Sequence, residues 1–431
     1  MNPRLSRCMK LRNQLLALAC IVAFLAAGYL YVRTWVVQKP FGIIVFLSDG
    51  VVTSHLTAAR LYEGGADHEL ALERFPHVAL LRNPARDFAV PDDAAAGTAF
   101  STGQRGNHRH LAVDSRGRNL QTIVDLARAQ RRSVGLVTNG SLTSPTAAAF
   151  YAHTTDSTDT QGIARQLVAG ATLDVMLGGG AADFLPESRG GRREDGRDLL
   201  AELQDRGVEI LMNKAQLEEA EPYRTGGIMG LFSSGVLSFS NQVEGASQQP
   251  SLPDMVRRAI VFLQQNRNGY LLIVDAALVT TAAERNEGER AITETLALDQ
   301  AVDTAISYAG ERSLIIAAGK HSTGGMSLNG YPLRQDHGVA LLGSDAAGHP
   351  ALTWATGPNG PAPAVPPPFP TDTAAPPTGA RTSLGEPAAF QTQAALSNAE
   401  DVLALGRGEG AEAVRGWMDN TQIFEILKNA L

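Results

Sequence analysis

Cysteine is almost absent from this chain, and no basic stripe stands out. The two cysteines, Cys8 and Cys20, both lie in the first twenty residues, so the remainder can form no disulfide and has no thiol chemistry. The formal net charge is −7 and only 19% of residues are charged, which argues against nucleic-acid binding. A hydrophobic content of 44% over 431 residues is typical of a globular protein with one large domain or two ordinary ones.

The N-terminus carries an uncharged run from Leu15 to Val32, closed by Arg33. As a helix this run would span about 27 Å, close to the hydrocarbon core of a bilayer. Basic residues precede it, namely Arg4, Arg7, Lys10 and Arg12. Because basic flanks stay in the cytoplasm, we expect a short tail over residues 1–14, a transmembrane signal anchor over 15–33 and an exported chain.

A cleaved signal peptide is the alternative to an anchor. Its apolar core is usually shorter and ends at an A-x-A site. The A-x-A at Ala17-Leu18-Ala19 lies near the start of the apolar run, which is too early. The sequence therefore favours inner-membrane anchoring with the domain in the periplasm or outside the cell, and secretion after cleavage is the alternative.

From Phe41 onward, short apolar runs alternate with amphipathic stretches, as in GIIVFLSDG (Gly42 to Gly50) and the helical pattern from Leu56 to Glu63. This alternation predicts an α/β fold with a mainly parallel sheet covered on both faces, in one domain over residues 38–431. Ligand sites in such sheets lie beyond the carboxyl ends of the strands. The predicted strands end at polar residues: Asp49, Asn139, Asp275, Lys320 and His321.

Two further stretches are placed by their composition. Gly357 to Gly379 is rich in Pro, Ala and Gly and predicts an extended surface insert rather than a core element. The stretch after Phe390 returns to a helix-like pattern and ends with Asp419 to Leu431.

The stretch from Asp92 to Gly103 (DDAAAGTAFSTG) predicts a helix that starts at Ala94 and is capped by Asp92 or Asp93. The small residues from Ala94 to Gly97 let another group approach the helix end. Helix N-termini bind anions, and a carboxylate placed there occupies that anion site itself. A capped helix with small residues for close packing is the alternative explanation.

These residues resemble the nucleophile helix of the alkaline phosphatases, D-S-A-A-x-A-T-A followed by a turn. Other segments resemble the same family in the same order: Gly42 to Arg60, Leu136 to His153, DVMLGGG, Pro250 to Ile260, YLLIVDA, Glu294 to Val302, HSTGG (His321 to Gly325) and AEDV (Ala399 to Val402). The resemblance implies a three-layer α/β/α sandwich around a central, mainly parallel sheet.

Active members of that family use two zinc ions about 4 Å apart to clamp the attacking and leaving oxygens of phosphoryl transfer. A serine attacks, a magnesium ion lies nearby, and an arginine holds two phosphate oxygens. The nucleophile position falls on Asp93 in this sequence. The arginine position falls on Ser157.

The resemblance also assigns the metal positions. The zinc that activates the nucleophile would be held at Asp49, Asp93, Lys320 and His321. The other zinc would use Thr280, Glu284 and Ser397, none of which is a usual ligand of that site. The magnesium positions are Asp49, Thr146, Asp275 and Ser144, although matching Ser144-Pro145 to the family's Thr-Pro instead makes Ser144 the hydroxyl ligand.

The substitutions form a consistent set. An ammonium from Lys320 near Asp49 and Asp93 can neutralise buried carboxylates without a metal. The usual two-zinc centre is then not intact, while Asp49, Thr146 and Asp275 are oxygen donors suited to one weakly bound Mg²⁺, with His321 as a further residual ligand.

Two functions follow from this resemblance. The first is a catalytically impaired or inactive family member that acts by binding an unknown partner. The second is a metal-dependent phosphomonoesterase with a rearranged site and Asp93 as a carboxylate nucleophile. A homodimer, or pairing with an active homologue, fits either function.

Overall fold

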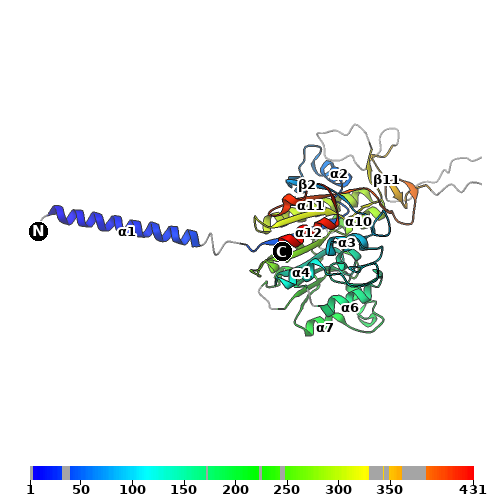
Figure 1. The fold of residues 1–431 in the computed structure, drawn as a ribbon, viewed down its shortest axis with the longest axis horizontal. Helices are drawn as coiled ribbons and strands as arrows, with labels where there is room; N and C mark the ends of the chain where they lie inside the picture. Colours follow the sequence, from blue (N-terminus) through cyan, green and yellow to red (C-terminus); the bar gives the residue numbers. More distant parts are fainter. Residues whose placement is uncertain are drawn as a thin grey trace, which may run out of the picture. The chain divides into compact units, whose positions relative to one another are not determined.

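The computed structural model describes residues 3–31, 39–170, 173–222, 226–242, 248–329, 343, 349–361 and 385–431. It divides into two compact units, Met1–Pro40 and Phe41–Leu431. The first holds helix α1 (Pro3–Tyr31), in which Arg12–Tyr31 is long and apolar enough to cross a membrane (Figure 1). This composition is compatible with a membrane anchor and with a signal peptide.

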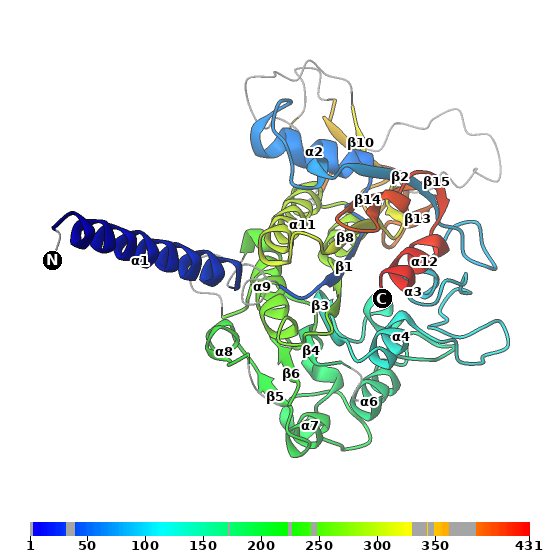
Figure 2. The same cartoon turned by 60° about the vertical axis from the view of Figure 1, so that its left-hand side comes forward.

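The second unit is built on one large sheet. Within the described residues its ten strands follow the order β15-β2-β14-β8-β1-β7-β3-β4-β6-β5 (Figure 2). Their bounds are β1 (Gly42–Ser48), β2 (His77–Arg82), β3 (Ser133–Ser141), β4 (Val175–Gly179), β5 (Glu209–Leu211), β6 (Ile228–Leu231), β7 (Tyr270–Asp275), β8 (Leu314–Gly319), β14 (Val402–Arg407) and β15 (Gly416–Asp419). Strand β14 pairs antiparallel with β2 and β8, and the other pairs in the sheet are parallel. The mainly parallel α/β fold is confirmed.

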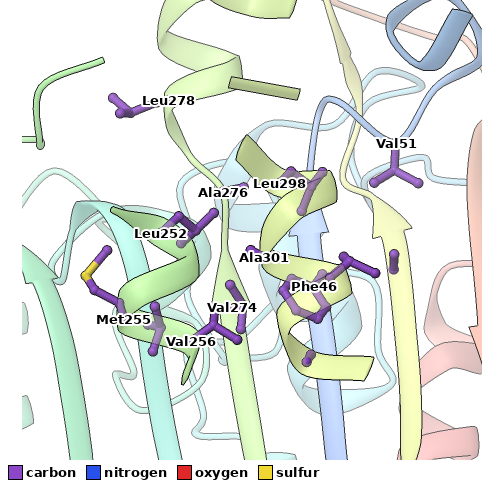
Figure 3. Packing of buried hydrophobic residues seen from close by; sticks show 14 of the residues in the cluster. Phe46, Val51, Leu252, Met255, Val256, Val274, Ala276, Leu278, Leu298 and Ala301 are labelled. Atoms are coloured by element: carbon purple, nitrogen blue, oxygen red, sulfur yellow. The ribbon is translucent and has the colours of Figure 1, made fainter. Parts of the chain in front are cut away.

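Helices cover both faces of the sheet, because alternate residues of the central strands point to opposite sides. On one face, Phe46 of β1 lies in a core with helices α2 (Thr53–Gly64), α9 (Leu252–Leu263), α10 (Leu278–Glu284) and α11 (Gly288–Tyr308). Figure 3 shows Val256 of α9 and Ala301 of α11 close to Phe46 and Val274. On the other face, Val45 lies in a core with α4 (Ile123–Ala129), α6 (Thr160–Gly170), α7 (Leu199–Asp205) and α12 (Thr421–Ala430).

Short elements complete the fold around the carboxyl end of the sheet and its edges. Helix α3 (Asp93–Thr102) packs against α5 (Pro145–Ala148), and α8 spans Lys214–Glu219. Strands β10 (Ser327–Leu328), β11 (Leu352–Gly357) and β12 (Ala388–Gln391) form a small sheet, and β9 (Ser322–Thr323) pairs with β13 (Ser397–Asn398).

Some boundaries differ from the sequence expectations. The helix-like pattern expected after Phe390 is wrong for most of that stretch, because it forms strands β13, β14 and β15 and only α12, which begins at Thr421, is an α-helix. Strands β2, β6, β14 and β15 were not predicted. Strand β15 lies at an edge of the sheet with β2 beside it, and in both of them exposed residues interrupt the apolar run. Of the expected insert, Gly357 ends β11, and residues 362–379 lie outside the described residues.

Candidate functional site

The N-terminus of α3 decides where Asp93 points. Asp92 is the N-cap, because its Oδ1 accepts a hydrogen bond from the Ala95 N–H at 2.8 Å. Its Oδ2 accepts a second bond, from the Arg109 N–H at 2.8 Å. The helix therefore starts at Asp93 rather than at Ala94, and Asp93 is not a cap. Its carboxylate is left for other partners.

The small residues of α3 serve close packing against α5. A Cβ on Gly97 would lie 2.9 Å from the Ala149 Cβ and 3.2 Å from the Thr146 Cα. This approach lets the Thr146 hydroxyl donate to Asp93 Oδ1 at 3.0 Å. The close packing of α3 on α5 therefore also builds the site, because a bulkier residue at position 97 would push Thr146 away from Asp93.

Lys320 follows strand β8 and occupies the centre of the site. Its side chain is 1% exposed, and Nζ donates to Asp93 Oδ1 at 2.8 Å. Two hydroxyls lie 3.3 Å from Nζ, on Thr146 and Thr280. Two further carboxylates are 3.6 Å and 3.9 Å away, on Asp275 and Asp49. These groups come from the carboxyl ends of β1, β7 and β8, where parallel sheets place ligand sites, and from the three helices α3, α5 and α10.

His321 bridges two of the same carboxylates. Its Nδ1 lies 3.3 Å from Asp49 Oδ2, and its Nε2 lies 3.2 Å from Asp93 Oδ1. A ring that faces a carboxylate oxygen with each nitrogen is best served by the imidazolium form, in which both nitrogens donate. Thr323 donates to Asp49 Oδ2 at 2.6 Å, and the Ser397 hydroxyl lies 3.4 Å from Nδ1.

Electrostatics follow from this geometry. Burial disfavours the charged forms, yet Lys320 and His321 outweigh it and hold the pKa of Asp93 well below its ordinary value. Burial likewise opposes the charge on His321, but Asp49 and Asp93 raise its pKa to about 10. For Asp275, burial prevails over the attraction of Lys320 and raises the pKa to about 6. Two cations therefore balance the ionised Asp49 and Asp93, and the third carboxylate titrates just below neutrality.

Three predicted residues lie outside this hydrogen-bonded cluster. Glu284 is the last residue of α10 and is exposed at the rim of the site. Partial burial raises the pKa of its carboxyl, and the nearby Asp93 and Asp49 raise it further. No hydrogen bond between the described residues joins Glu284 to Lys320, although the nearby ammonium partly lowers its pKa. Ser144 precedes α5 and its buried hydroxyl has no hydrogen-bond partner, so Thr146 is the hydroxyl that reaches the cluster.

Ser157 is tied to a different residue. Its N–H donates to the Arg109 carbonyl at 2.8 Å, and the Arg109 guanidinium pairs with Asp156 at 2.8 Å and with the Thr158 hydroxyl at 3.2 Å. The resemblance assigns the phosphate-binding arginine to position 157. The guanidinium of Arg109, from a different loop, lies beside that position. Arg109 has a positive φ of 63°, which sequence patterns do not reveal.

Sequence reasoning also missed three supporting residues. Thr138 donates to Asp275 Oδ2 at 3.2 Å, Thr323 holds Asp49, and the Asn83 amide donates to the Lys320 carbonyl at 3.0 Å. Thr323 lies within the HSTGG segment, so its position beside His321 was a usable signal. No sequence signal pointed to Asn83, because it follows strand β2, which was not predicted.

Comparison with known proteins decides the family. The alkaline phosphatase family model matches residues 42–431. The chain belongs to the alkaline phosphatase family. It is 28% identical to alkaline phosphatase 4 of Bacillus subtilis over 313 residues, a match that covers 70% of this chain and 65% of that protein. It is also 28% identical to the alkaline phosphatase of Gadus morhua over 372 residues, covering 74% and 78% of the two chains.

Solved alkaline phosphatases share the fold. The enzyme of the Antarctic bacterium TAB5 superposes with a TM-score of 0.71 at 20% identity and covers 91% of this chain and 98% of its own. The Thermus thermophilus enzyme gives a TM-score of 0.71 at 23% identity, covering 92% of each chain.

The alkaline phosphatase family is metal-dependent, so the residues present must be tested against its ions. Among the described residues, no group of three or more His, Cys, Asp or Glu side chains is arranged to hold a metal. The donor chemistry gives the physical reason: the positions that the resemblance assigns to zinc ligands hold the hydroxyls of Thr280 and Ser397, and both nitrogens of His321 face carboxylates. The magnesium donors Asp49, Thr146 and Asp275 are present, but Lys320 Nζ lies within 3.9 Å of all three. The residues do not fit the family's ions without displacement of that ammonium.

Proposed function

We propose that this alkaline phosphatase homologue is a non-catalytic member of its family that acts by binding. The observation that carries this proposal is the position of Lys320, whose ammonium lies among the carboxylates that would otherwise hold metal. A phosphatase of this family needs dications to stabilise the attacking and leaving oxygens. A fixed monovalent cation, already hydrogen-bonded to Asp93, does not supply that stabilisation.

The nucleophile position supports the same proposal. Asp93 Oδ1 accepts from Lys320 and Thr146 and faces His321. Three donors on one oxygen stabilise the carboxylate and weaken it as a nucleophile. The side chain of Asp93 is still 30% exposed, so the site remains open to a ligand that could contact it.

One observation favours the alternative, a metal-dependent phosphomonoesterase with a rearranged site. Oδ1 of Asp49 and Oδ1 of Asp275 are buried without a hydrogen-bond partner. Buried carboxylate oxygens are usually satisfied by hydrogen bonds or metals, and a weakly held Mg²⁺ could occupy this place if Lys320 swung out.

Metal content and turnover distinguish the two functions. The full chain, purified in detergent, is analysed for bound metal and then assayed on a simple phosphate monoester at alkaline pH with added Zn²⁺ and Mg²⁺. We expect no stoichiometric zinc and negligible turnover. Two zinc equivalents per chain, or a turnover of about 1 s⁻¹ or more that disappears in Asp93→Ala, would overturn the proposal.

We further propose that α1 anchors the protein in the inner membrane with residues 41–431 in the periplasm or outside the cell. The support is the basic flank before the apolar segment and the length of Arg12–Tyr31. A partner would then meet the site outside the cytoplasm, whether that partner is a second copy, an active homologue or another molecule.

A further inference from the structure

Three strands of the sheet begin side by side, at the end opposite the candidate site. The loop before β3 and the loop before β7 are joined by hydrogen bonds from the Ser133 N–H to the Gly269 carbonyl at 3.2 Å and from the Asn266 amide to the Arg131 carbonyl at 2.8 Å. Gly269 has φ +92°, and a Cβ there would lie 2.4 Å from the Phe41 carbonyl. Only glycine allows this approach, which brings both loops against the residue before β1.

Basic side chains gather on this surface. We call Arg131, Arg132, Arg267 and Lys428 the basal cluster; Arg131, Arg267 and Lys428 are exposed. The Arg132 guanidinium lies 5.8 Å from the centre of the Phe41 ring and donates to the Ala430 carbonyl at 3.3 Å, which places the end of α12 beside the same strand starts.

Acidic neighbours offset only part of this charge. Lys428 pairs with Glu425 at 3.3 Å, Arg132 also donates to an oxygen of Leu431, and the nearby Arg128 pairs with Asp174 at 2.7 Å. The loop before β8, whose Ser313 hydroxyl accepts from the Gly42 N–H, adds the exposed Glu311 and an Arg312–Glu409 pair. For Arg131 and Arg267 the structure shows no acidic partner among the described residues. Both side chains are therefore available to an anion in solution or on a surface.

The charge of the rest of the domain makes the cluster stand out. The first 40 residues carry six positive and no negative charges, so the formal charge falls from −7 for the chain to about −13 for residues 41–431. Such a domain is repelled by an anionic surface in most orientations. Around Phe41, the exposed Arg131 and Arg267 supply positive charge that opposes this repulsion.

We propose that the basal cluster binds the anionic lipid headgroups of the bilayer that holds α1. This inference rests on the membrane attachment proposed above and not on the loss of catalysis. Residues 32–40 link the end of α1 to Phe41 and can span at most about 30 Å when fully extended. The start of β1 is thus tethered close to the membrane surface, within reach of the headgroups that attract Arg and Lys.

The orientation has a consequence for the site. Strand β1 runs from the base to the candidate site, and its length over Gly42–Ser48 is about 23 Å. With the basal cluster on the headgroups, Asp49 and Lys320 face away from the membrane. The site is then presented to partners in solution rather than to lipid.

Fluorescence quenching in bilayer nanodiscs tests this orientation with the full chain. Cys8 and Cys20 are changed to Ser, and a fluorophore is attached at Gln130→Cys, which is exposed beside Arg131, or at Ser115→Cys in the loop before α4. The quencher is a nitroxide-headgroup lipid in discs that contain phosphatidylglycerol or only phosphatidylcholine. We expect strong quenching at position 130 and weak quenching at 115, in the anionic discs and at low salt.

Charge reversal supplies the matched comparison. Each basic residue near an anionic surface contributes roughly fivefold in binding, so Arg131→Glu with Arg267→Glu should shift the bound-to-free ratio by at least about 25-fold. Arg86→Glu with Arg116→Glu, in two exposed loops away from the base, should leave the quenching unchanged. Arg131→Gln with Arg267→Gln serves if the reversed variant does not fold.

The outcomes are distinct. Equal quenching in both lipids, or quenching that survives reversal and high salt, would overturn binding by the cluster. Failure of the chain to enter the discs would overturn the membrane attachment on which it rests. Phosphatase turnover by the same samples would bear only on the loss of catalysis.

Discussion

The ammonium of Lys320 and the carboxylate of Asp93 lie 2.8 Å apart although 227 residues separate them in the chain. Lys320 follows a central strand, while Asp93 begins a helix that packs on α5. In this pair the residue at the family's nucleophile position is bound to a fixed cation of the protein itself. On the function proposed above, the stability of the site and the loss of catalysis have the same physical origin.

Removing the Lys320 charge should destabilise the protein. In Lys320→Met the carboxylates of Asp49, Asp93 and Asp275 face one another without a cation, and breaking a buried pair typically costs about 3–5 kcal/mol. Denaturant melts measure the loss. The control is Lys214→Met, whose ion pair with Asp254 is exposed and should change stability by about 0–1 kcal/mol. Unchanged stability of Lys320→Met would show that Lys320 does not neutralise the site.

A carboxylate at position 320 should make the stability of the protein depend on bound metal. Lys320→Asp is expected to be still less stable than Lys320→Met without metal, because it adds a negative charge. Zn²⁺ or Mg²⁺ should raise its melting temperature by mass action, while the wild type should melt at the same temperature with and without chelator. A wild type that melts lower in chelator would contradict our account of Lys320.

Restoring the serine alone should not restore phosphatase activity. In Asp93→Ser the hydroxyl nucleophile of the family returns, but Lys320, Thr280 and Ser397 still stand where metal would be needed. Turnover of a phosphate monoester should stay well below about 1 s⁻¹. Asp92→Ser is the matched control, because it keeps a good N-cap and leaves Asp93 in place. Efficient hydrolysis by Asp93→Ser would mean that the metal site is intact.

A buried glutamate outside the site predicts a pH dependence. Glu294 is 0% exposed and accepts hydrogen bonds from the Ser240 N–H and the Asn139 amide, yet burial raises its pKa to about 6. Because the folded pKa exceeds the unfolded one, the associated stability is full below about pH 4.5 and is lost as pH rises through 6.

Glu294→Gln removes this titration. Its stability relative to the wild type should rise by about 2 kcal/mol between pH 4.5 and 7.5, as measured by urea unfolding. Glu311→Gln, an exposed substitution, should follow the wild type at every pH. Parallel curves for Glu294→Gln and the wild type would contradict the raised pKa.

The proposed topology predicts the behaviour of fusions. A reporter that is active only in the cytoplasm should give no signal when fused after Leu431, and should give signal when fused before Met1. A bright signal from the fusion after Leu431 would place residues 41–431 in the cytoplasm and would also remove the basis for lipid binding on the exported side.

By itself, the sequence determined the family, the α/β alternation and the polar residues at the ends of the central strands. These follow from local patterns. A buried strand must be an apolar run, and the residues after it must lie at the carboxyl end of the sheet. Asp49, Asp275 and Lys320 were found in this way. Strand β2, which lies next to the edge strand β15, lacks the pattern because exposed and half-buried residues interrupt its buried ones.

Only the tertiary structure decided which groups meet. The resemblance placed Lys320 beside Asp49 and Asp93, and the fold also brings its ammonium to the Thr146 hydroxyl and the Asp275 carboxylate. It also showed that Asp92 caps α3, and it assembled Arg131 and Arg267 from separate loops into one basic surface. These are distances between residues far apart in the chain, which depend on strand order and helix packing and leave no trace in local sequence spacing.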